Sequence, residues 1–411
     1  MHTNPGITVR KKKLIRVLIL FLMMLFAAGI SLNLMAESAE TAATSASEEE
    51  WISDAFTDQK TEAILAGMTL EEKAAQLFVI MPEALTGVQG VTMAGSVTEA
   101  AFAQYPVGGI LYMENNIQSW DQTSQMLSSM QKISESRIGL PVFLAVDEEG
   151  GRVSRISGRL ENVPYIPDMY SIASAGDSLQ AYDLGRKIGS CLNQIGFNVD
   201  FAPVADVLTN PDNSVIGDRA FGSDPKVASA MVSMEITGLS EEGVCSTLKH
   251  FPGHGNTSED SHQGLAVSYR TLEEMRDCEF LPFKSGIEAG AEFVMAGHVA
   301  TPNVTGDDTP ASLSYQMLTT ILRGELGFQG IIITDALNMG AIVNAYGAGD
   351  AAVKAFEAGA DMLLAPGDFQ SAYNAVLEAV ISGRISQERL EESLKRIIRL
   401  KLKMQEDLPA E

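Results

Sequence analysis

The segment from Lys249 to His262 holds side chains whose types and spacing could support catalysis. It reads KHFPGHGNTSEDSH and contains three of the five histidines of the chain. His250 and His254 have the i, i+4 spacing of a helical metal-binding pair, but Pro252 and its neighbouring glycines break a helix here. The segment is therefore predicted to be a loop, and loops on a rigid scaffold often carry functional residues.

Asp260 and His262 in this loop could act as an acid/base pair. They lie two residues apart, so in an extended or turned segment the carboxylate can accept the ring N–H of the imidazole and orient it. Histidine titrates near neutral pH, so His262 could donate a proton to a leaving oxygen and later accept one from water. Gly253, Gly255 and Gly264 flank the pair and are expected to let the loop close over a substrate. A solvated polar loop is the alternative.

Asp335 offers a different chemistry. It directly follows four β-branched residues in the segment IIITDALNMG. A carboxylate in this position can attack an anomeric carbon and form a covalent glycosyl intermediate, which is the retaining route of glycoside hydrolysis. It could equally bind a metal ion, so this residue alone does not decide the reaction.

Eight short apolar runs after residue 52 are predicted to be the strands that position these side chains. Near-continuous apolar runs of this length are typical of parallel strands that are covered on both faces. The runs are QLFVIM (76–81), GGILYM (108–113), PVFLAVD (141–147), FNVDFAPVAD (197–206), CSTLKHF (245–251), EFVMAGH (292–298), GIIITDAL (330–337) and ADMLLAP (360–366).

Helical patterns alternate with these runs. Thr69 and Glu72 have the spacing of a capping box that begins an early helix. The alternation predicts an α/β fold, a (β/α)8 TIM barrel that forms a single catalytic domain over residues 52–411, with a doubly wound open sheet as the alternative. The later helices are expected at 181–195, 226–242, 271–289, 314–326 and 387–404.

Polar residues lie at the ends of several apolar runs. Active sites of TIM barrels lie at the carboxyl ends of the strands, so these residues are expected to converge. Asp206 and His298 have an alternative role as buried, hydrogen-bonded supports. The residues at or near the run ends are Asp147, Asp206, Lys249, His250, His298 and Asp335.

The amino terminus is predicted to direct export. Five basic residues precede an unbroken apolar run from Val17 to Ile30, so residues 1–36 are expected to be a signal peptide or a membrane anchor that places the protein outside the cytoplasmic membrane. Residues 37–51 are expected to form a flexible acidic spacer. The net charge of −24 argues against a nucleic-acid partner, and three cysteines are too few for a disulfide framework.

Five motifs together resemble the family-3 glycoside hydrolases. Within that family the sequence is similar to the bacterial β-N-acetylglucosaminidases, in the same order over roughly residues 60–403. The motifs are KHFPGHG followed by DSH, AVDEEGGRVSR (145–155), GFNVDFAPVADV (196–207), IGDRAFG (216–222) and TDALNMGAI (334–342).

The resemblance implies a role for seven residues. Asp335 would be the nucleophile, and His262, oriented by Asp260, would be the acid/base. Related β-glucosidases take the acid/base from a Glu in a second domain. Since only eight residues follow Lys403, we expect the histidine branch. We also expect a monomer and no cofactor. The residues that would hold the sugar hydroxyls are Asp147, Arg219, Lys249 and His250.

The resemblance also implies a substrate. This is terminal β-linked N-acetylglucosamine, typically attached to N-acetylmuramic acid in peptidoglycan fragments. Because a neutral imidazole donor adds no second negative charge beside the nucleophile, this chemistry does not need a raised carboxylic acid pKa. The alternatives are a β-glucosidase or phosphorylase of the same family, and a non-catalytic glycan-binding protein at the cell surface.

A metal-dependent hydrolase is the remaining alternative. Lys249 argues against it, because a cation beside the supposed ligand His250 would repel a divalent metal, whereas it suits hydrogen bonding to sugar hydroxyls. The candidate ligands are His250, His254, His262, His298, Asp147 and Asp335.

Overall fold

The computed structural model describes residues 57–258, 261 and 264–406. The chain forms two units, Met1–Lys60 and Thr61–Glu411, and every element described below belongs to the second. The predicted export segment (1–36) and spacer (37–51) lie outside the described residues. Within the part that is described, no helix is both long and apolar enough to cross a membrane.

All eight apolar runs contain a strand, as predicted. Two further short strands, β6 (Ala266–Val267) and β8 (Val299–Ala300), pair with each other in parallel and were not predicted. The eight predicted strands are β1 (Phe78–Ile80), β2 (Gly109–Leu111), β3 (Phe143–Val146), β4 (Val199–Asp200), β5 (Thr247–Phe251), β7 (Phe293–Ala296), β9 (Ile331–Thr334) and β10 (Leu363–Leu364).

These strands form two parallel sheets. One has the order β10-β1-β2-β3-β4 and the other β5-β7-β9. An isolated parallel bridge between Val199 and Cys245 connects the β4 edge to the residues that lead into β5, and another between Ile333 and Met362 connects β9 to the residues that lead into β10. The prediction of a parallel α/β fold is therefore confirmed.

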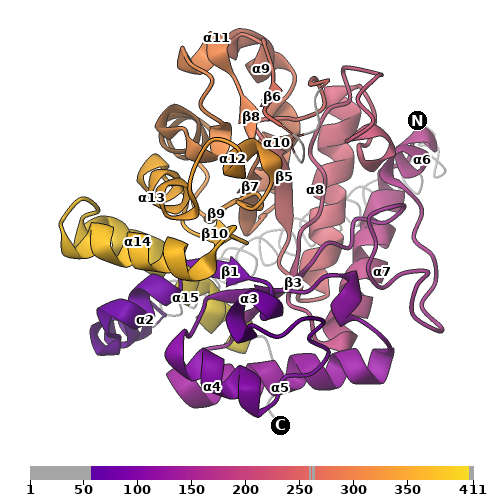
Figure 1. Ribbon diagram of the computed structural model, residues 1–411. Coiled ribbons are helices and arrows are strands. Elements are labelled where there is room, and N and C mark those ends of the chain that lie inside the picture. Colours follow the sequence, from indigo (N-terminus) through magenta and orange to yellow (C-terminus); the bar gives the residue numbers. More distant parts are fainter. Residues whose placement is uncertain (1–56, 259–260, 262–263, 407–411) are drawn as a thin grey trace, which may run out of the picture. The chain divides into compact units, whose positions relative to one another are not determined.

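Helices surround the strands in Figure 1. Residues Gln316–Glu325 form a π-helix, and three 3-10 turns span Glu114–Asn116, Gly217–Arg219 and Ala311–Leu313. The α-helices are α2 (Leu70–Ala75), α3 (Pro82–Thr86), α4 (Ser96–Gln104), α5 (Trp120–Ile138), α6 (Met169–Ser174), α7 (Leu179–Ile195), α8 (Pro225–Glu241), α9 (Leu272–Asp277), α10 (Phe280–Glu288), α11 (Pro302–Thr305), α12 (Gly340–Val343), α13 (Ala348–Ala358), α14 (Phe369–Ile381) and α15 (Gln387–Glu406).

Local sequence explains the start of one helix and the interruption of another. The capping box predicted for α2 is present, with the Glu72 N–H donating to Thr69 Oγ1 at 3.2 Å and the Thr69 N–H to Glu72 Oε2 at 3.0 Å. The prediction of a single helix at 271–289 is wrong, because the helix is interrupted at Cys278 and two helices, α9 and α10, form instead. Pro282 explains the break, since its ring would clash with the carbonyl of residue 278 in a continuous helix.

Close packing of α7 against α8 depends on two glycines. A Cβ added to Gly185 would lie 2.2 Å from the carbonyl oxygen of Glu235, and one added to Gly238 would lie 2.4 Å from that of Tyr182. The two helix backbones can therefore approach one another only because neither position carries a side chain.

The Glu235 carboxyl group on the inner face of α8 is fully buried. Among the described residues neither of its carboxyl oxygens has a hydrogen-bond partner. Burial, with a smaller contribution from the negative charge of Glu149, raises the pKa of Glu235 to about 8. Glu235 therefore stays protonated in the folded protein at neutral pH, although it ionises near 4.5 in an unfolded chain.

Substitution of Glu235 by Gln should change how stability depends on pH. Between about pH 4.5 and 8 the folded wild type binds a proton that the unfolded chain has lost, so the Glu235 contribution to stability falls as pH rises. A neutral amide removes this dependence. The difference in the free energy of unfolding, Glu235→Gln minus wild type, should therefore increase by roughly 3–5 kcal/mol between about pH 5 and pH 9. Denaturant titrations of both proteins at each pH measure this difference.

Glu241→Gln provides the matched control on the same helix. Glu241 is exposed, so its substitution should leave the pH dependence of unfolding unchanged. A Glu235→Gln variant whose difference from wild type did not vary with pH would contradict a protonated, buried carboxyl group.

Candidate active site

A cavity of about 320 Å³ lies where the strands end. In parallel α/β folds, ligands bind at the carboxyl ends of the strands, because residues far apart in the sequence converge there. Five of the seven predicted site residues line this cavity: Asp147, Arg219, Lys249, His250 and Asp335.

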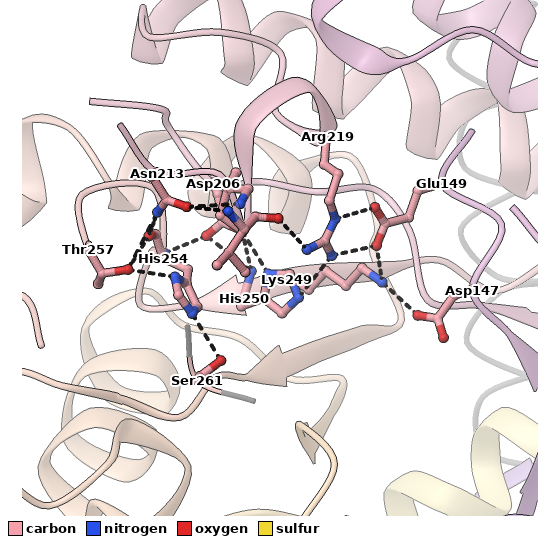
Figure 2. Close-up of polar contacts among 12 residues, drawn as sticks. Asp147, Glu149, Asp206, Asn213, Arg219, Lys249, His250, His254, Thr257 and Ser261 are labelled. Atoms are coloured by element: carbon pink, nitrogen blue, oxygen red, sulfur yellow. Dashed lines mark hydrogen bonds and ion pairs between the residues drawn. The ribbon is translucent and has the colours of Figure 1, made fainter. Parts of the chain in front are cut away.

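Four residues, Asp147, Glu149, Arg219 and Lys249, form a charge network on one wall of the cavity (Figure 2). The Lys249 ammonium lies 2.8 Å from Asp147 Oδ1 and 2.6 Å from Glu149 Oε1, and only 2% of the Lys249 side chain is exposed. Arg219 donates from Nε and Nη2 to the two carboxylate oxygens of Glu149, both at 2.7 Å. Two carboxylates thus compensate two cations in a place where unpaired charges would be costly.

The buried charges of the network keep one another ionised. Burial alone would raise the pKa of Glu149, but the charges of Arg219 and Lys249 hold it well below its usual value. Burial alone would lower the pKa of Lys249, but Asp147 and Glu149 raise it. The network therefore presents fixed donors and acceptors to a polar ligand.

Glu149 was missed by the sequence analysis, although the segment that contains it was noted. Asp147 and Glu149 are two residues apart, as side chains on one face of an extended segment are. Glu148 between them is turned away from the network, and its carboxylate accepts backbone N–H groups of Arg155, Ile156 and Ser157 at 2.7–3.0 Å. The alternation would have indicated that Glu149 lies on the same side of the segment as Asp147, where both carboxylates contact Lys249.

Asp206 fixes His250 and the loop that follows it. Its Oδ2 lies 2.7 Å from His250 Nδ1, and its Oδ1 accepts the His254 N–H at 2.6 Å. Arg219 Nη2 lies 3.4 Å from His250 Nε2. Because a guanidinium can only donate, His250 Nε2 is the acceptor and Nδ1 carries the proton that is donated to Asp206.

Two glycines of the KHFPGHG segment are required by space. A Cβ on Gly255 would lie 2.1 Å from the carbonyl oxygen of Val207, and one on Gly253 would lie 2.6 Å from Glu279 Cγ. Gly253 also has a positive φ of 126°. Close packing therefore accounts for these two glycines, which the sequence analysis had attributed to freedom of the loop to close.

Asp335 directly follows β9 and is partly exposed in the cavity. Its Oδ1 accepts the Ala336 N–H at 2.7 Å. Burial alone would raise the pKa of Asp335, but the nearby imidazoles of His298 and His250, that N–H and Lys249 together lower it. Asp335 is therefore a carboxylate at neutral pH.

His298, which contributes to the lowered pKa of this carboxylate, is fully buried. Its Nδ1 lies 2.8 Å from Ser312 Oγ and its Nε2 lies 2.9 Å from the carbonyl oxygen of Ala336. His298 and Asp206 thus have the hydrogen-bonded, supporting positions that the sequence analysis gave as their alternative role.

Asp260 and His262 lie outside the described residues. Ser261 between them is described, lines the cavity, and places its Oγ 3.1 Å from His254 Nε2. Arg155 is a second lining residue that the sequence analysis did not single out, and its Nη2 lies 3.9 Å from Asp147 Oδ2.

The candidate metal ligands do not form a metal site in the described part of the chain. No group of three or more His, Cys, Asp or Glu side chains among residues 57–258, 261 and 264–406 could hold a metal ion. Cys191 and Cys278 are free thiols.

A cavity at the carboxyl ends of parallel strands, with charged side chains on one wall and apolar side chains elsewhere, is the arrangement of an α/β enzyme domain of the TIM-barrel type. The model of the glycosyl hydrolase family 3 N-terminal domain matches residues 69–400. The chain therefore belongs to glycoside hydrolase family 3, as the motifs implied.

Similar proteins carry related names. Beta-hexosaminidase LpqI of Mycobacterium tuberculosis is 33% identical over 347 residues, which are 82% of this chain and 84% of that protein. Beta-hexosaminidase A of Pseudoalteromonas piscicida is 35% identical over 327 residues, but the match spans only 54% of its length. The structure of a family 3 beta-N-acetylglucosaminidase from Paenibacillus sp. str. FPU-7 matches with a TM-score of 0.79 and 35% identity over 84% of this chain and 64% of that one.

Substitution of Glu149 by Gln should destabilise the protein. It removes one of the two negative charges that compensate Arg219 and Lys249, while the shape of the side chain is kept. We expect the free energy of unfolding at neutral pH to fall by roughly 2–4 kcal/mol, measured by denaturant titration.

Glu357→Gln is the control for loss of an ion pair at the surface. Glu357 pairs with Arg384 at 2.7 Å in an exposed position, so its substitution should cost less than about 0.5 kcal/mol. Equal losses in the two variants would show that Glu149 does not have the proposed role in compensating buried charge.

Proposed function

We propose that this protein is a retaining exo-β-N-acetylglucosaminidase that hydrolyses terminal β-linked N-acetylglucosamine. One observation carries the proposal: the ionised carboxylate of Asp335 shares a cavity with the polar groups of the charge network and His250, which are suited to holding a sugar. The names of the relatives, beta-hexosaminidase and beta-N-acetylglucosaminidase, support the choice of sugar.

The reaction would proceed in two steps. In the first, Asp335 attacks the anomeric carbon, the bond from this carbon to the leaving oxygen breaks, and His262 donates its proton to that oxygen. In the second, His262 accepts a proton from water, the water oxygen bonds to the anomeric carbon, and the Asp335 carboxylate is released. Asp260 would orient the imidazole of His262 by accepting its other ring N–H.

The sugar hydroxyls would bind to Asp147, Arg219, Lys249 and His250. An ammonium group has three N–H donors, and Asp147 and Glu149 take two from Lys249, so one donor is left for a hydroxyl. Asp147 can accept from hydroxyls through Oδ2, because its hydrogen bond with Lys249 uses Oδ1. These contacts would hold the sugar with its anomeric carbon toward Asp335.

The size of the cavity supports action on a terminal sugar. Its volume of about 320 Å³ is near the lower end of the range for ligand pockets, roughly 300–1,000 Å³. We propose peptidoglycan fragments with N-acetylmuramic acid as the leaving sugar as the natural substrate, on the strength of the sequence resemblance. A β-glucosidase or a phosphorylase of the same family remains the alternative.

We also propose the finer points of architecture and location. The two isolated bridges at the sheet edges support closure of the eight strands into one barrel, which would form a single catalytic domain over residues 52–411. Residues 1–36 would act as a signal peptide or membrane anchor and place a monomeric enzyme outside the cytoplasmic membrane. The negative net charge of −24 disfavours nucleic acid as a partner.

Three aryl glycosides assayed side by side test the proposed activity. The full chain should hydrolyse an aryl β-N-acetylglucosaminide with a higher kcat/KM than the matching β-glucoside and β-xyloside. Asp335→Ala should lower kcat by more than about 10⁴-fold, because the nucleophile is lost, and Asp260→Asn should lower it by about 10²-fold through misorientation of the imidazole.

Asp350→Ala serves as the matched control because Asp350 is an exposed aspartate on α13. Its rates should equal those of the wild type. Preference for the β-glucoside would replace the proposed substrate, and an Asp335→Ala variant with normal turnover would refute the assignment of the nucleophile.

A further inference from the structure

Ser261 is notable among the cavity-lining residues because of its place in the chain. It lies between Asp260 and His262, the two residues proposed for the acid/base step. Ser261 is almost completely buried, with only 2% of its surface exposed to solvent. Its side chain and its backbone are each hydrogen-bonded to a different part of the protein, so its position is fixed from two sides.

The side chain of Ser261 contacts the imidazole of His254, with 3.1 Å between Oγ and Nε2 (Figure 2). His254 is also only 2% exposed, and burial is the main cause that lowers its pKa. The imidazole is therefore neutral at neutral pH, with one ring nitrogen as donor and the other as acceptor. Because the hydroxyls of Ser261 and Thr257 can each donate or accept, both ring nitrogens have a partner.

His254 is itself held in three ways. Its backbone N–H donates to Asp206 Oδ1 at 2.6 Å, its carbonyl accepts from Asn213 Nδ2 at 2.8 Å, and its Nδ1 lies 2.8 Å from Thr257 Oγ1. Asp206 also holds His250, so the same carboxylate positions His254 and a predicted sugar-binding residue. His254 is therefore a fixed point to which Ser261 is attached.

The backbone of Ser261 is tied to the segment that follows Asp335. The Ala341 N–H donates to the Ser261 carbonyl at 3.2 Å. Ala341 lies in the first turn of α12, where backbone N–H groups have no partner within the helix. Ser261 thus connects the loop after β5 with the part of the chain that carries the proposed nucleophile.

We propose that Ser261 is a positioning residue for the acid/base step, and that its hydrogen bond to His254 sets where that step can occur relative to Asp335. The inference rests on the proposed function. Asp260 and His262 are the residues bonded to Ser261 on either side in the chain, so a shift of Ser261 is passed on to both. A misplacement of about 1 Å in a catalytic group can reduce the rate about 100-fold.

Leaving-group dependence tests this role in the full chain. A 2,4-dinitrophenyl leaving group needs little protonation, whereas a phenyl leaving group depends on the general acid. Ser261→Ala should lower kcat/KM for phenyl β-N-acetylglucosaminide about 10- to 100-fold and for the dinitrophenyl glycoside less than about 3-fold. Azide needs no general base, so it should accelerate turnover of the dinitrophenyl glycoside by this variant.

Two substitutions of His254 separate the contact from general damage to the fold. A Gln side chain is long enough to place its amide near the position of His254 Nε2 and so can keep the contact with Ser261. An Asn side chain is shorter and reaches only the position of His254 Nδ1, which contacts Thr257. His254→Asn should therefore reproduce the leaving-group dependence of Ser261→Ala, and His254→Gln should be closer to wild type. Ser268→Ala is the control, because it removes another buried serine hydroxyl, which lies 3.4 Å from Asn256 Oδ1. Melting temperatures verify that each variant is folded.

The outcomes distinguish this inference from the proposed function. If Ser261→Ala lowers kcat/KM equally for both glycosides, or for neither, the positioning role is overturned. If His262→Ala shows leaving-group dependence and Ser261→Ala does not, the positioning role fails while the proposed function stands. If the wild type hydrolyses neither glycoside, or if His262→Ala shows no leaving-group dependence, the acid/base assignment fails and the inference with it.

Discussion

The buried ammonium group of Lys249 is the constraint around which the site is organised. It is almost completely removed from water, and it remains charged because the Asp147 and Glu149 carboxylates lie within 2.8 Å of it. Glu149 must in turn compensate Arg219, which lies on a different segment. The ends of β3 and β5 and the turn that carries Arg219 therefore cannot shift independently, and the cavity they enclose keeps its polar lining in place.

This arrangement gives the carboxylates of one cavity different tasks. Glu149 is fully buried and bonded to two cations, and so it is a structural counter-charge. Asp335 is partly exposed to the cavity and accepts a backbone N–H, and its lowered pKa keeps it ionised. A nucleophile requires accessibility and negative charge together, and Asp335 has both. Environment rather than residue type therefore separates the group that would react from the groups that hold the substrate.

The strands could be predicted from sequence because buried parallel strands need continuous apolar runs, and residues such as Asp147 and Asp335 mark where those runs end. The break at Cys278 could have been predicted from Pro282, but the amphipathic pattern continues across it and hid the break. Glu149 could have been found from its alternation with Asp147. Its contact with Arg219 and the contact of Ser261 with Ala341 could not, because each joins residues that are far apart in the chain. The close approach of Gly255 to Val207 is likewise a tertiary contact. The sequence alone does not show that this position has no room for a side chain, and the glycine was therefore attributed to flexibility of the loop.

The central claim is that Asp335 forms a covalent bond to the sugar, and trapping that intermediate tests it most directly. A 5-fluoro β-N-acetylglucosaminyl fluoride carries a good leaving group and slows both steps, so the glycosyl enzyme should accumulate. Mass spectrometry of proteolytic fragments should then show one added sugar on the peptide that contains Asp335, and no addition in the Asp335→Ala variant. A sugar on a different residue, or inverted product from an enzyme that never becomes labelled, would contradict the account.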